Sequence, residues 1–412
     1  MNKPKPHVIM IAYYFPPSPE IGARRPARFH KWLQRMGYRC HVVTAAPQGE
    51  NRSADVHFIA DETYELWDKG RGKRSLKFYF ELLVRQLMFP GHIGIVWSRK
   101  AAAQISRIVR EHPDGSFVMF STYPPLGTLL AGLKVHRQMK IPWIADFRDP
   151  MASLLVDDEP AYWRFWTLWL EKQVVGNASV VVANTDTAAK AWSERYPWAR
   201  QKVRALYNGF DPEDCLAPRP VPERSRKIIL HAGTFYHGRN PNIVLESMAR
   251  LREQNAAEAE AAKILLLGTS SNFAGANAPL YERGQREGWL ELRDAVPRPE
   301  AEKIIEEADG LLLFQGHSSV QVPGKLYEYI CVGRPLLALL LRPSPVEPIL
   351  EKCGVAHVCV YTDDPPEVAD RKLLEFLRLP NTAAPINDWF GGNFNSKVQT
   401  EKLAEMIEEI SK

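Results

Sequence analysis

Short apolar runs alternate along the chain with polar or glycine-bearing loops and with stretches of helical periodicity. In the first half, the runs that predict buried strands are residues 8–12, 41–44, 117–121, 143–145 and 178–183. The second half restarts the pattern with runs at 228–232, 262–267, 292–296, 311–314 and 336–341. Because most runs are followed by a loop and a helical segment, the order predicts right-handed crossovers and two parallel sheets.

A change in composition near the middle of the chain predicts where one domain ends. Residues 217–223 hold three prolines in seven positions, which is typical of a stiff interdomain linker. We therefore expect an α/β protein with two Rossmann-like, doubly wound domains, residues 1–215 and residues 216–385, followed by a tail at 386–412 that carries aromatic residues and an amphipathic helix.

The stretch from Val320 to Pro335 follows the apolar run at 310–314 and is predicted to form a helix. Pro323 suits a first helical turn, and Gly333 with Pro335 would end the helix. A helix that begins at the carboxyl end of a strand directs free amides at an anion. Lys325 and Glu328 would add a cation for a diphosphate and an acceptor for sugar hydroxyls. The alternative is an ordinary buried helix with a Lys–Glu pair.

Composition narrows the class of protein. A chain of 412 residues exceeds one ordinary core, and 45% hydrophobic with 25% charged residues is normal for a globular protein. Five scattered cysteines without metal-ligand spacing predict a reducing, cytoplasmic setting and no disulfide framework. The run at 8–12 is too short for a signal peptide, and no run reaches the roughly 20 residues of a membrane span. A net charge of +5 does not by itself indicate a nucleic-acid partner.

Candidate chemistry in the first half lies at predicted strand ends. Asp146, Arg148 and Asp149 follow the run at 143–145, where open α/β sheets place ligands. A structural Asp–Arg pair is the alternative. Gly22, just ahead of a helix predicted at 23–36, lets backbone approach a ligand closely. Arg25 or its neighbour Arg24 would reach into the same cleft.

Three segments fit either the protein core or an anionic membrane surface. The predicted helix at 23–36 has one cationic face, residues 71–89 form a basic amphipathic segment, and residues 162–169 are rich in aromatic side chains. The alternative for the helix at 23–36 is an ordinary solvated face. For residues 71–89 it is a core helix with a solvent-exposed basic edge, and for residues 162–169 it is core packing.

In the second half, Gly233, Arg239 and the amides around Gly324 and Lys325 would together hold a diphosphate. The sequence has no Gly-x-x-x-x-Gly-Lys-Ser/Thr loop, no Gly-x-Gly-x-x-Gly after the first strand and no metal-binding motif. These absences disfavour a P-loop ATPase and a dinucleotide oxidoreductase. They favour a transferase in which cations and helix amides, rather than a metal or a cofactor, stabilise a departing diphosphate.

The ordered set of motifs resembles the family-four, retaining GT-B glycosyltransferases that build bacterial polysaccharides. The resemblance covers essentially the whole chain and is carried by residues 13–22, 37–44, 145–150, 208–211, 232–234 and 322–335. It implies two Rossmann-like domains that face a central cleft, with residues 386–412 crossing back to the first domain. It also implies a metal-independent hexosyltransferase for cell-surface polysaccharide or glycoconjugate synthesis, working peripherally at the inner face of the cytoplasmic membrane.

The resemblance implies a set of site residues. Glu328 matches the ribose-binding glutamate, and Val296 to Arg298 lies where the family reads the base. Asp146, Asp149 and Arg148 lie where polar side chains face the reacting sugar, and Arg25 matches a first-domain residue facing the acceptor. The residues matched to the donor diphosphate are Gly22, Gly233, Thr234, Arg239, Gly324 and Lys325. The implied donor is a UDP- or GDP-sugar, and the acceptor is lipid-linked or a small molecule.

One position departs from the family pattern. Val320 stands where the family usually carries a second glutamate, eight residues before the ribose-binding one, that faces the donor sugar. His317 or Gln321 would have to replace that carboxylate. The departure keeps open a catalytically inactive GT-B scaffold that binds nucleotide, and a nucleotide-sugar epimerase on the same architecture is a third alternative.

Overall fold

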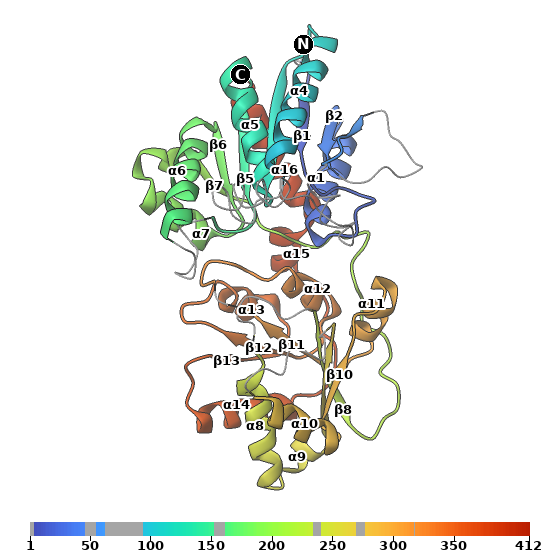
Figure 1. Ribbon diagram of the computed structural model, residues 1–412. Coiled ribbons are helices and arrows are strands. Elements are labelled where there is room, and N and C mark those ends of the chain that lie inside the picture. The colour runs from blue at the N-terminus through green and yellow to red at the C-terminus, as the bar shows by residue number, and fades with distance from the viewer. Residues whose placement is uncertain are drawn as a thin grey trace, which may run out of the picture. The chain divides into compact units, whose positions relative to one another are not determined.

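The computed structural model describes residues 4–45, 55–61, 94–151, 161–233, 240–268, 277–316 and 318–412 (Figure 1). The chain forms two compact units. Unit 1 comprises Met1–Asn208 and Ser396–Lys412, and unit 2 comprises Gly209–Asn395. The boundaries thus fall at Asn208 and Asn395 rather than at the predicted 215 and 385. The cause of the earlier first boundary is a bond from the Phe210 amide to the Phe394 carbonyl, which ties residues after 208 into unit 2.

Unit 1 is built on a parallel sheet that contains, within the described residues, seven strands in the order β3-β2-β1-β4-β5-β6-β7. Their bounds are β1 (His7–Ile11), β2 (Cys40–Thr44), β3 (Val56–Phe58), β4 (Phe117–Tyr123), β5 (Trp143–Phe147), β6 (Val180–Ala183) and β7 (Val203–Ala205). The order runs outward from β1 in one direction and then restarts at β4 in the other. The topological switch point of unit 1 therefore lies between β1 and β4.

Helices cover both faces of this sheet because its strands are apolar on both sides. The described helices of unit 1 are η1 (Ile21–Ala23), α1 (Arg24–Arg35), α4 (Ile95–Glu111), α5 (Leu126–Met139), α6 (Ala161–Asn177), α7 (Asp186–Arg195), η2 (Pro197–Lys202) and α16 (Ser396–Ile410). One face packs on α4 and α5, and the other packs on α1 and α16. Figure 1 shows the red α16 beside the blue α1, although α1 ends at Arg35 and α16 begins only at Ser396.

Unit 2 contains a second parallel sheet with, among the described residues, six strands in the order β10-β9-β8-β11-β12-β13. Their bounds are β8 (Lys227–Ala232), β9 (Ala262–Leu267), β10 (Leu290–Arg293), β11 (Gly310–Phe314), β12 (Leu336–Leu340) and β13 (His357–Tyr361). The switch point of this sheet lies between β8 and β11. Alternate residues of its strands form one core with the helices α8 and α14.

The described helices of unit 2 are α8 (Asn242–Glu253), α9 (Ala257–Glu260), α10 (Ala278–Arg286), α11 (Arg298–Glu306), α12 (Lys325–Val332), α13 (Glu347–Cys353), α14 (Pro366–Arg378) and α15 (Asp388–Phe394). Helix α12 ends as predicted at Gly333, which takes the left-handed conformation at φ 71°. It begins two residues after Pro323, whose carbonyl accepts from the Leu326 amide. None of the helices in the described part of the chain is long and apolar enough to cross a bilayer.

The predicted two-sheet α/β architecture is confirmed, and several details are corrected. The proline-rich segment 217–223 is part of unit 2 and not a linker between units, because it bonds to Glu306 through the Ala217 amide and the Arg219 side chain. Asp146 lies inside β5 rather than after it. The elements β3, α5, α10 and β13 were not predicted from the sequence. They are short or follow proline-rich and polar stretches.

Candidate functional site

An arginine of α1 lies at the carboxyl edge of the unit 1 sheet and binds groups of the same unit. Arg25, in the first turn of α1, donates to both carboxylate oxygens of Asp146, with Nε–Oδ2 and Nη2–Oδ1 distances of 3.0 and 2.8 Å. Its remaining N–H groups donate to the Leu206 and Tyr207 carbonyls and to Asn208 Oδ1 at 2.8, 2.9 and 3.1 Å. An arginine has five N–H donors, so these five contacts account for all of them.

Burial makes this pair structural. Arg25 is 7% exposed, Asp146 is fully buried, and the Thr122 hydroxyl donates to Asp146 Oδ2 at 2.7 Å. A buried charge is tolerated only when it is paired and hydrogen-bonded, as it is here. The structure therefore gives Asp146 a partner from α1, whereas the motif around it pointed to its neighbour Arg148. The roles expected from the sequence, Arg25 facing an acceptor and Asp146 the reacting sugar, stay predictions.

Arg148 lies just past the end of β5 and holds backbone rather than a carboxylate. Its guanidinium donates to the Gly22 carbonyl and, at 2.6 Å, to the Pro124 carbonyl. A Cβ atom built on Gly22 would lie 2.6 Å from Arg148 Nη2, so any larger residue here would have to displace the end of the Arg148 side chain. Burial lowers the pKa of Arg148, while the nearby Asp149 and Asp146 carboxylates act in the opposite direction. Asp149 itself is half-buried.

The carboxyl edge of the unit 2 sheet brings together several of the predicted donor residues. Gly233 follows β8 directly, and Lys325 opens α12 after β11, so both stand at the switch point. A Cβ atom on Gly233 would lie 2.8 Å from Lys325 Cε, which means that the lysine stem passes over the glycine. The Ala232 amide donates to the Tyr329 hydroxyl oxygen at 3.0 Å and holds α12 against the end of β8.

The amino terminus of α12 points its backbone amides at this edge without a side-chain cap. Gly324 is the N-cap residue, makes no side-chain hydrogen bond and is exposed, with nothing within 4 Å of a Cβ atom built on it. Glu328 lies in the first turn and is half-buried. The arrangement of a helix amino terminus without a side-chain cap, a lysine and a carboxylate can bind an anion and an adjacent hydroxyl-bearing group.

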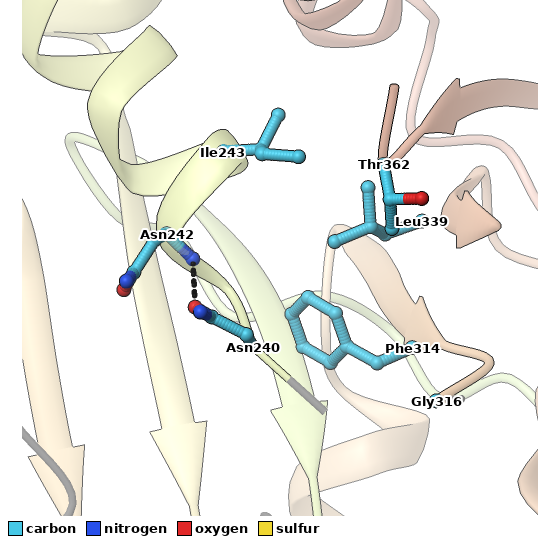
Figure 2. Close-up of a pocket in the computed structure, with 7 residues that line it drawn as sticks. All are labelled: Asn240, Asn242, Ile243, Phe314, Gly316, Leu339 and Thr362. Atoms are coloured by element: carbon cyan, nitrogen blue, oxygen red, sulfur yellow. Dashed lines mark hydrogen bonds between the residues drawn. The ribbon is translucent and has the colours of Figure 1, made fainter. Parts of the chain in front are cut away.

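A cavity of about 240 Å³ opens at the same edge, on the α8 side. It is lined by Asn240, Asn242, Ile243, Phe314, Gly316, Leu339 and Thr362. Figure 2 shows Ile243, Phe314 and Leu339 converging from α8, β11 and β12, and the Asn242 amide bonded to Asn240 Oδ1 at 2.8 Å. Asn240 and Gly316 belong to the loops that follow β8 and β11, so the cavity lies at the switch point of unit 2.

The other predicted site residues have separate surroundings. Val296 is half-buried between β10 and α11, and the exposed Arg298 pairs with Glu302 and, at 3.1 Å, with Asp214. Gln321 is half-buried before α12. Thr234, Arg239 and His317 lie outside the described residues, as does the basic segment 71–89.

Sequence reasoning missed the residues that line the cavity. Thr362 follows β13. Residues 357–361 are a mostly apolar run, His-Val-Cys-Val-Tyr, from which this strand could have been predicted. Asn240 and Asn242 belong to no recognised motif. Only their position, at the end of the loop after β8, could have indicated that they line a site.

The fold and its two switch-point edges define a protein of the GT-B class. Among solved structures, the chain is similar to the sucrose-phosphate synthase of Thermosynechococcus elongatus (TM-score 0.62, 14% identity, 98% of this chain and 99% of that one covered). It is also similar to WaaG, a glycosyltransferase involved in lipopolysaccharide biosynthesis (TM-score 0.58, 14% identity, 97% and 99% covered). A third is Anabaena HepE in complex with UDP and glucose (TM-score 0.58, 12% identity, 98% and 99% covered).

The sequence matches a family model over part of its length. Residues 22–214 match the model of Glycosyltransferase Family 4, and the whole chain shares the GT-B fold of the solved structures above. The resemblance seen in the sequence is therefore confirmed. No curated protein matches the chain.

Proposed function

We propose that the protein transfers a sugar from a nucleotide-diphosphate sugar to an acceptor, with retention of the anomeric configuration. The observation that carries the proposal is the carboxyl edge of the unit 2 sheet. There Lys325 passes over Gly233, the half-buried Glu328 lies in the first turn of α12, which has no side-chain cap, and a cavity opens at the same edge of the sheet. The structural neighbour HepE has been solved with UDP-glucose, which supports a UDP-sugar as the donor, and a GDP-sugar is the alternative.

In this proposal each group of the edge has a chemical role. The α12 amides and Lys325 bind the diphosphate and stabilise the negative charge that develops as the donor bond breaks, without a metal ion being needed for that charge. Glu328 accepts hydrogen bonds from the ribose hydroxyls, and the backbone around Val296 and Arg298 contacts the base. Thr234, Arg239 and His317 complete the donor site as the resemblance implies.

The proposed reaction site in unit 1 is revised by the geometry. Asp149 is the carboxylate we propose to face the reacting sugar. Asp146 and Arg25 instead fix the edge on which Asp149 stands, because their charges are satisfied by each other and by buried neighbours. Arg148 holds the Gly22 loop in place through its carbonyl contacts, and Gly22 keeps that loop close enough for a donor phosphate to approach.

The test is nucleoside-diphosphate binding by the Glu328→Ala variant. Calorimetry with UDP and GDP should show affinity reduced by about tenfold or more, since hydrogen bonds to a charged group are worth about 1.5–3 kcal/mol. Glu367→Ala is the matched control, because Glu367 is an exposed glutamate in the first turn of another unit 2 helix, α14. Equal affinity of the Glu328 variant and the wild type for both nucleotides would remove the assignment.

Val320 favours one second candidate, a GT-B scaffold that binds nucleotide without turnover. Incubation with candidate UDP- and GDP-sugars separates the two. Acceptor-dependent release of the nucleoside diphosphate supports transfer, and tight binding without release supports the scaffold. Interconversion of the sugar without acceptor would instead support an epimerase. The anomeric configuration of the product, read by NMR, tests retention.

We further propose that the acceptor is lipid-linked or a small molecule of cell-surface polysaccharide or glycoconjugate synthesis. The protein would then work in the cytoplasm, at the inner face of the membrane. Exposed aromatics support contact with a membrane interface: Phe165 and Trp169 on α6 and Trp198 on η2 are 66, 46 and 57% exposed. Flotation with anionic vesicles should show binding that salt weakens. Absence of binding at low salt would refute membrane contact while leaving the transfer reaction untouched.

A further inference from the structure

Three histidines meet at the amino edge of the unit 1 sheet, the edge opposite the switch-point loops. His7 is the first residue of β1, His41 lies in β2, and His112 is the C-cap of α4. Their ring centroids lie 5.2 to 5.4 Å apart in all three pairs. One ring nitrogen from each lies within 4.8 Å of the other two.

Two of the rings have polar contacts outside the cluster, a hydrogen bond for His112 and a longer contact with a carboxylate for His41. His112 Nδ1 lies 3.0 Å from the Ile108 carbonyl, which can only accept, so this nitrogen carries the proton and Nε2 keeps its lone pair. His41 Nδ1 lies 3.7 Å from Asp55 Oδ1, on the side away from His7. A histidine that ligates a metal commonly donates its other N–H to a carbonyl or carboxylate in this way.

The spacing inside the cluster is close to that of metal ligands. His41 Nε2 and His7 Nδ1 are 3.2 Å apart. Two nitrogens bound tetrahedrally to one zinc ion at 2.0–2.1 Å are about 3.3–3.4 Å apart. A ring nitrogen of His112 lies within 4.8 Å of both. Imidazole donors suit zinc, cobalt, nickel and copper, and they do not suit calcium or magnesium.

The protonation state of the rings is compatible with a metal. Burial lowers the pKa of His7 and lowers that of His41 to about 4, with Arg39 acting in the same direction and Asp55 in the opposite one. For His7 and His41 the direction of these shifts favours the neutral imidazole, which is the form that binds a metal ion.

We propose that His7, His41 and His112 form a three-nitrogen site for a divalent transition metal of the zinc type. Asp55 orients His41 from outside the ligand set. The ion would tie β1 and β2 to the carboxyl end of α4, and a water molecule would complete its coordination. The site stands on residues distinct from those proposed to bind the donor, so it does not depend on the proposed function.

The first experiment uses the full-length chain stripped with a chelator and titrated at pH 7.5 with Co²⁺ or Zn²⁺. We expect one equivalent of Co²⁺ to bind with tetrahedral d–d absorption, and Zn²⁺ to bind competitively and raise the melting temperature. The His112→Ala variant should bind at least about tenfold more weakly. The matched control is His357→Ala: this half-buried histidine of β13 bonds to the Val355 carbonyl at 2.9 Å, and its loss should leave binding unchanged.

A second variant tests direct ligation and keeps the proposal open to refutation if His112→Ala folds poorly. In His112→Cys, Co²⁺ should still bind and a thiolate-to-cobalt charge-transfer band should appear that the wild type lacks. The proposal is overturned if the wild type binds neither Co²⁺ nor Zn²⁺ saturably, which would show a metal-free histidine cluster. It is equally overturned if His112→Ala binds as tightly as the wild type or if His112→Cys produces no such band.

Discussion

At the carboxyl edge of the unit 1 sheet, charged side chains bind one another, whereas at the corresponding edge of unit 2 they stand beside a cavity. In unit 1 the five donors of Arg25 meet protein acceptors, and Arg148 holds two backbone carbonyls. In unit 2 the amides of α12 have no side-chain cap and a cavity of about 240 Å³ lies beside them. The same topology thus gives one edge that is internally satisfied and one that is suited to a ligand.

The difference has a physical cause in where each sheet places its charges. Asp146 is inside β5 and fully buried, so it requires a buried cation to offset its desolvation. In unit 2 the residues that β11 and β12 contribute to the cavity, Phe314 and Leu339, are apolar. The charges of that edge lie at its periphery instead, in Lys325, Glu328 and the turn after β13. Variants of the two edges should therefore fail in different ways.

The largest effect is expected from Arg25→Ala. Removing Arg25 leaves the Asp146 carboxylate buried with the Thr122 hydroxyl as its remaining hydrogen-bond donor among the described residues and should lower the free energy of unfolding of unit 1 by about 3–5 kcal/mol. Urea unfolding, with hydrogen exchange to assign the loss to unit 1, measures it. Arg107→Ala is the control, since its pair with Glu111 is exposed and should be worth less than about 1 kcal/mol. Equal losses in the two variants would contradict the internally satisfied edge.

Asp364 lies in the turn after β13, close in sequence to Thr362, which lines the unit 2 cavity. Its carboxylate accepts from Arg342 Nη2 at 2.9 Å, Lys372 Nζ at 2.7 Å and the Tyr361 amide at 2.9 Å. Burial opposes the charged form, yet these donors outweigh it and lower the pKa of Asp364 below its ordinary value. We expect Asp364→Asn to cost about 2 kcal/mol at pH 7, within the range for a lost buried charge-assisted bond.

The pH dependence of that loss follows from the sign of the shift. A carboxylate whose pKa is lower in the folded than in the unfolded state stabilises the fold above the unfolded value, about 4, and loses this contribution as the pH falls through the folded value. The difference between wild type and Asp364→Asn should therefore be full at pH 7 and shrink as the pH falls below about 4. Urea unfolding at pH 7, 4 and 3 measures it, and a difference that grows in acid would contradict the assignment.

A third variant asks whether the cavity is part of the donor site. Ile243 lies at the start of α8 and points toward Leu339 across the cavity (Figure 2), so Ile243→Trp should fill the space. We expect about tenfold weaker binding of a UDP- or GDP-sugar, equivalent to about 1.4 kcal/mol, with little change in melting temperature. Ile243→Val is the conservative control and should bind normally. Unaltered affinity in the tryptophan variant would separate the cavity from the donor site.

The sequence predicted the order of strands and helices well because apolar runs and glycine breaks are local signals. The α12 region is the best case, since one stretch contains the strand, the loop, Lys325 and Glu328. Pairings between distant segments were not predictable from spacing. Asp146 was associated with its neighbour Arg148, but Arg148 lies beyond the end of β5 and its side chain reaches the Gly22 carbonyl, while Asp146 meets Arg25 from α1.

The histidine cluster and the cavity escaped the sequence analysis for the same reason. His7, His41 and His112 come from two strands and a helix end, and no short spacing connects them. The cavity is lined from the start of α8 and from the ends of three strands, one of which, β13, was not predicted. Both depend on strand order in the sheet, which only the folded chain specifies.

The smallest effect is expected where unit 2 fixes the position of α12. The Tyr329 hydroxyl accepts from the Ala232 amide at the end of β8, and Tyr329→Phe removes this acceptor from a buried N–H group. The expected cost is about 1 kcal/mol, the net value of a typical hydrogen bond. Tyr281→Phe, whose hydroxyl makes a longer contact of 3.3 Å with Asn242, should cost less.

Hydrogen exchange at the Ala232 amide would assign this small effect to the loss of its hydrogen bond with the Tyr329 hydroxyl. If α12 is held at the switch point by this bond, the Ala232 amide should exchange faster in Tyr329→Phe, and amides in the middle of β8, such as Leu230, should keep their protection. Nucleotide affinity should fall only slightly, because the α12 amides and Lys325 remain in place. Unchanged exchange at Ala232 would show that packing of the buried Tyr329 ring, and not its hydroxyl, positions the helix that the donor is proposed to meet.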